Sequence, residues 1–152
     1  MATGTANTIE VGAITIEFLV GAEDSNGSVT VFECTVPAGA TVPLAHSHDG
    51  FEETVYGLEG TCLFVIDGHE REIRPGDSVC IRRGQVHGFD NRGQTDMKFL
   101  AIASPGVFGP AYFRDVNEVL AAAAGGPPDL AAIAEVMRRH GLTPARPAQS
   151  AA

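Results

Sequence analysis

The sequence has little of what a nucleic-acid-binding protein needs. Tryptophan is absent, aromatic residues make up 7% of the chain, and 10 Lys and Arg residues face 19 Asp and Glu residues, which gives a formal net charge of −9. Proteins that bind nucleic acids through their phosphates need basic patches. We therefore expect no nucleic-acid partner.

Cysteine and long apolar runs are also scarce. The 3 cysteines, Cys34, Cys62 and Cys80, are far apart in the sequence and form no C-x-x-C pair, which argues against a cysteine-based zinc site. Each lies in an apolar run typical of a β-strand, so we predict buried free thiols and a reducing compartment. The first residues lack the basic and apolar segments of a signal peptide, and no apolar run approaches the roughly 18 residues of a membrane span. These absences predict a cytoplasmic protein with no membrane partner.

The pattern that is present is that of an all-β domain. The chain has 18 glycines and 9 prolines in 152 residues, and these punctuate short runs of β-branched and apolar residues. Asp67-Gly68 separates two such runs, which is a strong signal for a β-hairpin. Such a succession of short strands is typical of a β-sandwich or β-barrel. The predicted strands are Ala13–Val20, Ser28–Val36, Val42–His48, Glu53–Leu58, Cys62–Ile66, His69–Ile73, Ser78–Arg82, Val86–Asn91 and Met97–Ser104.

The C-terminal third has a different composition. Tyr112–Ala124 is helical in character, and Asp129 is placed to cap a second helix that ends near His140. We therefore expect disordered residues 1–7, a β-barrel over residues 8–105, a helical extension over residues 106–143 and a disordered tail over residues 144–152.

Histidines and a glutamate form the most informative motif. His46 and His48 are two residues apart, so in a strand their imidazoles point to the same face. Glu53 and His87 can reach the same point from neighbouring strands. Three imidazoles and one carboxylate suit a divalent first-row metal. Glu52 is an alternative to Glu53, although adjacent strand residues face opposite ways and only one of the two can point inward.

The spacing of these residues resembles the two motifs of the cupin superfamily. The first motif runs from Gly39 through six residues to His46, Ser47 and His48, then through four residues to Glu53 and six more to Gly60. The second runs from Gly76 through five residues to Arg82, Arg83 and Gly84, then through two residues to His87 and three more to Asn91. The chain departs from the family pattern by one extra residue after Gly39 and by Arg82 in place of a proline.

The resemblance implies a double-stranded β-helix, or jelly-roll barrel, with a short C-terminal helical extension. It implies that His46, His48, Glu53 and His87 hold one divalent ion of iron, manganese, nickel, zinc or copper. It also implies a homodimer in which the N-terminal strands, with Ile14, Ile16 and Phe18, join the edge of a partner's sheet. The predicted partner besides a second copy is a small-molecule substrate.

Aromatic residues of the predicted strands are candidates for the substrate pocket. Phe89 is the first candidate because it is two residues from His87 in one strand and so points to the same face. Tyr56, Phe64 and Phe32 are the others. Phe108, Tyr112 and Phe113 either cover the mouth of the barrel or pack the tail.

Three functions are compatible with this site, since a fold does not fix a reaction. The first is a metal-dependent dioxygenase similar to the flavonol- and diketone-cleaving members of the family, in which Glu53 is both ligand and catalytic base. The second is a redox-neutral isomerase, cyclase or lyase that uses the same ion. The third is a cupin that binds a small molecule without chemistry.

Overall fold

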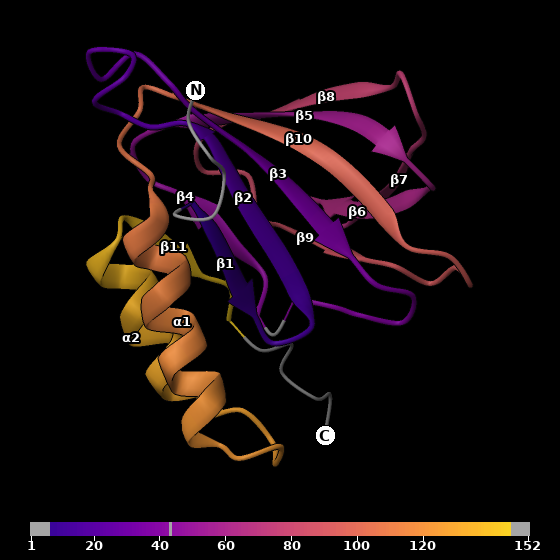
Figure 1. The fold of residues 1–152 in the computed structure, drawn as a ribbon. Coiled ribbons are helices and arrows are strands. Elements are labelled where there is room, and N and C mark those ends of the chain that lie inside the picture. Colours follow the sequence, from indigo (N-terminus) through magenta and orange to yellow (C-terminus); the bar gives the residue numbers. More distant parts are fainter. Residues whose placement is uncertain (1–6, 43, 147–152) are drawn as a thin grey trace.

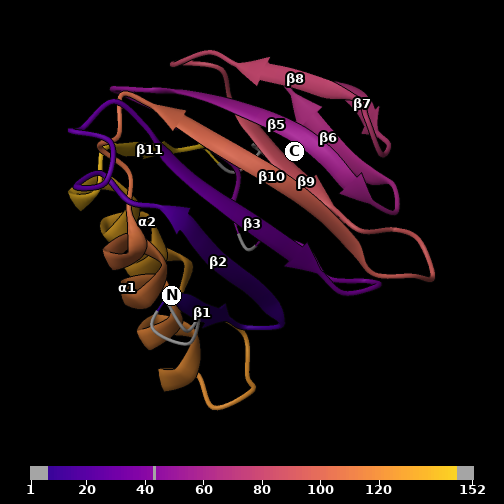
Figure 2. The ribbon, with the colours of Figure 1, turned by 45° about the horizontal axis from the view of Figure 1, so that its top comes forward.

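Two antiparallel β-sheets form the body of the protein. The computed structural model describes residues 7–42 and 44–146. Its strands are β1 (Thr8–Val11), β2 (Ile14–Val20), β3 (Thr30–Val36), β4 (His46–His48), β5 (Glu52–Glu59), β6 (Cys62–Ile66), β7 (His69–Ile73), β8 (Ser78–Ile81), β9 (His87–Asp90), β10 (Met97–Ser104) and β11 (Leu142–Pro144). One sheet has the order β1-β2-β3-β10-β5-β8 and the other has the order β11-β4-β9-β6-β7. This confirms the predicted all-β barrel, whose two sheets are seen in Figure 1 and Figure 2.

The core lies between the two sheets. Successive side chains of a strand point to opposite faces, so alternate residues are buried. In β3 these include Phe32 and Cys34, and in β10 they include Phe99 and Ala101, all nearly inaccessible to solvent. Cys80 is the exception to the predicted burial of the thiols, because it lies on the outward face of β8 and is exposed.

The hairpin between β6 and β7 follows from its two turn residues. Ile66 pairs with His69, and Asp67 and Gly68 between them have φ values of 49° and 80°. Positive φ at both central residues is what a two-residue turn needs to match the twist of the strands. The prediction from Asp67-Gly68 is therefore confirmed.

Two helices close one side of the barrel. Helix α1 covers Pro110–Ala122 and helix α2 covers Leu130–Arg139. The Asp129 side chain accepts a hydrogen bond of 3.0 Å from the Ala132 backbone N–H. This confirms that Asp129 caps the second helix. Figure 1 and Figure 2 show both helices beside β1 and β11. No helix among residues 7–42 and 44–146 is long and apolar enough to cross a membrane.

The structure adds two strands to those predicted and shortens a third. Strands β1 and β11 were not expected, and the predicted strand Val42–His48 is reduced to His46–His48. Pro144, expected to begin a disordered tail, lies in β11 opposite His46, and the Ala145 N–H donates to the Ala45 carbonyl at 2.8 Å. Three residues are too few to show an alternating pattern, so only pairing with β4 identifies this strand. Residues 1–6 and 147–152, which belong to the two predicted disordered ends, lie outside the described residues.

The residues expected to join a partner's sheet are used within the chain. Ile14, Ile16 and Phe18 are buried against the core, and β2 lies between β1 and β3 rather than at an edge. A homodimer stays a prediction, but these three side chains do not provide its contact.

Gly57 is a position where the fold tolerates no side chain. A Cβ there would meet the Arg74 carbonyl oxygen and lie 2.8 Å from the Arg74 carbonyl carbon. We expect Gly57→Ala to lower the free energy of unfolding by about 2–3 kcal/mol, because backbone cannot move aside as a side chain does. Urea unfolding measures this loss. Gly50→Ala is the matched control, since a Cβ there meets nothing within 4 Å; equal stability of the two variants would contradict the prediction.

Candidate metal centre and cavity

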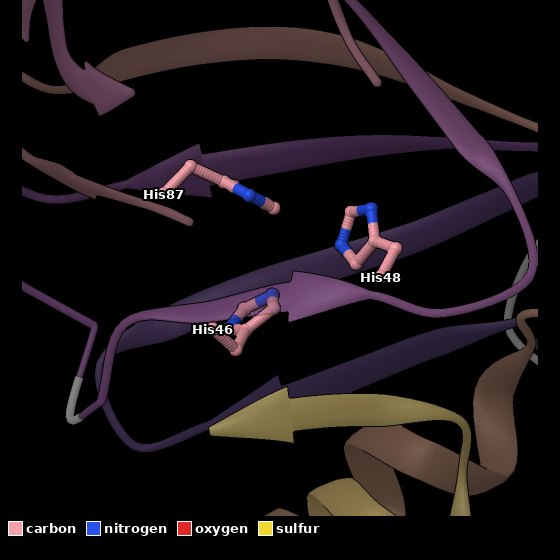
Figure 3. Close-up of side chains that lie close together, drawn as sticks. All are labelled: His46, His48 and His87. Carbon is pink, nitrogen blue, oxygen red and sulfur yellow. The ribbon is translucent and has the colours of Figure 1, made fainter. Parts of the chain in front are cut away.

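Three histidines converge between the sheets. His46 and His48 extend from β4. His87 extends from the neighbouring strand β9, where it lies opposite His46. The ring centroids are 4.8 Å apart for His46 and His87, and 4.5 Å apart for His48 and His87. One ligand nitrogen from each histidine lies within 4.8 Å of the others, and Figure 3 shows the three rings turned toward a common point.

Backbone carbonyls orient two of the rings. The Nδ1 atom of His46 is 3.3 Å from the Leu44 carbonyl oxygen, and the Nδ1 atom of His87 is 3.0 Å from the Gln85 carbonyl oxygen. A hydrogen bond there requires the proton on Nδ1, which leaves the Nε2 lone pair available to an ion. His48 is oriented differently, by stacking on Phe51 at a centroid distance of 4.2 Å.

Glu53 faces the histidines from the opposite sheet. Its Oε2 atom is 3.6 Å from the Nε2 atoms of both His48 and His87. Glu52 points the other way and binds Arg83, with Oε1 2.7 Å from Nη2. The alternation along β5 thus separates the two glutamates: Glu53 belongs to the cluster and Glu52 to the surface.

The electrostatics of the cluster keep two imidazoles neutral. Burial, together with the neighbouring His87 and His48, lowers the pKa of His46 to about 3, and burial also lowers the pKa of His48 to about 4. Burial opposes the charge on Glu53 and His87 as well, but each stabilises the other. The pKa of Glu53 is therefore lowered and that of His87 is raised.

The donor set fits a divalent metal ion. His87 Nε2, which faces Glu53, is buried and has no hydrogen-bond partner within the described part of the chain. A buried polar atom without a partner costs about 1–3 kcal/mol, and coordination of an ion uses such a lone pair. Neutral imidazoles are the form that binds metal. The cluster of His46, His48 and His87 can therefore hold an ion.

These pKa values predict that the metal-free protein loses stability in mild acid. His46 and His48 take up protons in the unfolded chain near their ordinary pKa of 6.5, but in the folded chain only near 3 and 4. Between these limits the unfolded state binds more protons, so stability falls as the pH falls. The raised pKa of His87 has its effect above 6.5 and does not offset this loss.

We expect the free energy of unfolding to fall by about 2 kcal/mol from about pH 6 to about pH 5, since two groups each contribute up to about 1.4 kcal/mol per pH unit. Urea unfolding of chelator-treated protein at each pH measures the slope. A flat or rising stability on acidification would contradict the prediction.

A cavity of about 360 Å³ opens beside the cluster. His46, His48, Glu53 and His87 line one part of it, and most of the rest is apolar. Its aromatic lining consists of Phe32, Phe64, Phe89, Phe99, Phe108, Tyr112 and Phe113.

The structure corrects the sequence prediction for Tyr56. Phe32, Phe64 and Phe89 line the cavity, but Tyr56 does not, and its side chain is 43% exposed. Glu53 and Val55 face the interior, so the strand alternation puts Tyr56 on the outer face of β5.

Sequence reasoning missed Phe51 and the cysteine in the cavity wall. Phe51 is buried against His48, and Cys34 lines the cavity from β3. Phe51 lies in the turn between His48 and Glu53, where no periodic pattern indicates which way a side chain points. Cys34 is two residues from Phe32 in the same strand, so the alternation of side chains could have placed both on the cavity wall.

The fold and site define a class: small β-barrel proteins with a histidine cluster inside. The Cupin domain family matches residues 32–103. An oxalate-binding protein of Thermotoga maritima is 32% identical over 92 residues, which cover 60% of this chain and 75% of that protein. The chain therefore belongs to the cupin family, as its motifs indicated.

A second curated relative and a solved structure differ in how much of their length is matched. Quercetin 2,3-dioxygenase of Bacillus subtilis is 28% identical over 96 residues, which are 63% of this chain but only 28% of that enzyme. The structure of the polyketide cyclase RemF from Streptomyces resistomycificus matches with a TM-score of 0.59 and 24% identity, over 80% of this chain and 92% of that one. The second likeness establishes the fold alone.

Proposed function

We propose that this protein is a metal-dependent enzyme that cleaves a small enolic aromatic molecule with dioxygen. One observation carries the proposal: three histidines and a glutamate border a cavity that is otherwise mainly apolar and aromatic. No Lys or Arg side chain lines the cavity among the described residues. Aromatic rings can be buried in such a space, whereas a small dianion such as oxalate would find no side-chain cation there.

The proposed ligands are His46, His48, His87 and Glu53. A divalent ion held by them supplies Lewis acidity and, if the metal is redox-active, electron transfer to dioxygen. Glu53 is the proposed catalytic base, because it is ionised and lines the cavity beside the histidines, where it can take the proton of an enol. The aromatic wall excludes water and holds the substrate ring against the histidines. The quercetin dioxygenase relative supports an aromatic, enolic substrate.

Oxygen uptake tests this proposal. Protein loaded separately with iron, manganese, nickel or copper is mixed with a panel of flavonols and β-diketones, and oxygen and substrate are followed together. We expect at least one metal to give uptake that matches substrate loss, and His48→Ala protein to give none. No uptake with any metal and any substrate would contradict the proposal.

A redox-neutral isomerase, cyclase or lyase is the second candidate. The position of Glu53, 3.6 Å from both His48 Nε2 and His87 Nε2, favours proton transfer whether or not oxygen takes part. Turnover by zinc-loaded protein without oxygen would identify this reaction. Ligand binding that survives alanine substitution of the histidines would instead support a purely binding role.

A further inference from the structure

Part of the cavity wall comes from outside the segment that matches the family. Helix α1 follows residue 103, where that match ends, and contributes Tyr112, Phe113, Val116 and Leu120 to the lining. All of these are apolar except for the hydroxyl group of Tyr112. Tyr112 is therefore the one lining residue of α1 that carries a polar side-chain atom.

The Tyr112 ring is fixed in place. Its centroid is 5.0 Å from that of Phe108, 5.1 Å from that of Phe113 and 5.7 Å from that of His140. The side chain is only 7% exposed. An aromatic side chain packed on three sides loses little further entropy when a ligand binds, which favours a positioning role.

The Tyr112 hydroxyl is available as a hydrogen-bond donor. Burial raises the pKa of the phenol, the nearby charge of Glu53 raises it further, and no hydrogen bond from the described residues contributes to the shift. The phenol therefore stays protonated. The buried Thr30 hydroxyl, by contrast, already donates to the Phe108 carbonyl at 2.7 Å. A donor beside a mainly apolar cavity is stabilised when a bound molecule supplies an acceptor, because burying a polar group without a partner is unfavourable.

Tyr112 also lies close to the histidine cluster. The Phe108 ring is 6.2 Å from His48 and 5.0 Å from Tyr112, so a single aromatic ring separates the tyrosine from a proposed ligand. Both Tyr112 and Glu53 line the same cavity. The cavity therefore reaches from the histidines to α1, so one molecule inside it can contact both.

We propose that the Tyr112 hydroxyl donates a hydrogen bond to a hydroxyl oxygen of the substrate other than the enol, and so selects aromatic molecules that carry a hydroxyl group beyond the enol. This inference rests on the proposed function, because the enol oxygen is placed at the histidines. A cavity that hydrogen-bonds a substrate oxygen discriminates strongly against an analogue that lacks it.

Binding of two probes to Tyr112→Phe protein tests the inference. The probes are a polyhydroxylated flavonol and the parent flavonol with no hydroxyl beyond the enol, each titrated into metal-loaded protein under nitrogen. We expect Tyr112→Phe to weaken binding of the polyhydroxylated probe about 10-fold and that of the parent less than about 2-fold, because only one hydrogen bond is lost. The substitution keeps the ring, so thermal unfolding should not change. Tyr56→Phe is the matched control, since Tyr56 is the other of the 2 tyrosines and lies outside the cavity.

The other outcomes separate the two proposals. If both probes bind wild-type protein and Tyr112→Phe binds them as tightly, the role of Tyr112 is overturned and the proposed function stands. Equal weakening of both probes would mean that Tyr112 only packs, which also overturns its role. If neither probe binds wild-type protein, the proposed substrate class and the inference both fail.

Discussion

His48→Ala is expected to remove the bound metal ion. The His48 side chain is 1% exposed, stacks on Phe51 and places Nε2 3.6 Å from Glu53, and it is one of the three clustered histidines that could hold an ion. Loss of a residue that merely supports a ligand costs about 10–100-fold in metal affinity, so loss of a ligand should cost at least about 100-fold. Elemental analysis should fall from about one ion per chain to almost none.

The control for this variant is a histidine outside the cluster. His69 is exposed at the start of β7, and His69→Ala should keep the full metal content. Circular dichroism checks that both variants fold, and His87→Ala repeats the test from β9. If folded His48→Ala and His87→Ala both bind as much metal as wild-type protein, the proposed centre is wrong.

Glu53→Gln is expected to have the largest effect on turnover. The amide has nearly the same shape as the carboxylate but cannot take a proton, and it is a weaker ligand. A positioned base contributes about 10²–10⁴-fold to a rate, so we expect kcat to fall at least about 100-fold. Metal content measured on the same sample separates the two roles. Lost activity with the ion retained indicates a base, and loss of both indicates a ligand.

Glu52→Gln is the matched control for this prediction. Glu52 precedes Glu53 in β5 but points outward to Arg83, which lowers the pKa of Glu52 to about 2. Its replacement should leave kcat within about 2-fold, because surface substitutions away from a site have small effects. Equal rates in the two variants would show that the reaction does not depend on Glu53.

The parts of the site that depend on local periodicity could be predicted from the sequence. The two-residue spacing of His46 and His48 indicated their common face, and strand parity placed Phe89 beside His87 on the cavity wall. The same rule, applied to Glu53, would have placed Tyr56 outside, since odd and even positions of β5 face opposite ways. That error came from using aromatic character in place of parity.

The parts that depend on long-range pairing could not be predicted. Strand β11 is identified only by its pairing with β4, about a hundred residues earlier in the chain, where Leu142 lies opposite His48. The buried face of α1 has a helical pattern in the sequence, but the pattern does not say that Tyr112 and Val116 meet a cavity rather than a solid core.

A crystal structure with anomalous diffraction at metal absorption edges would show whether the three histidines and Glu53 hold a metal ion. We expect one anomalous peak bounded by His46, His48 and His87, with a Glu53 oxygen as the fourth protein ligand. A peak elsewhere, or no peak in protein produced with iron, manganese, nickel, zinc and copper available, would contradict this assignment.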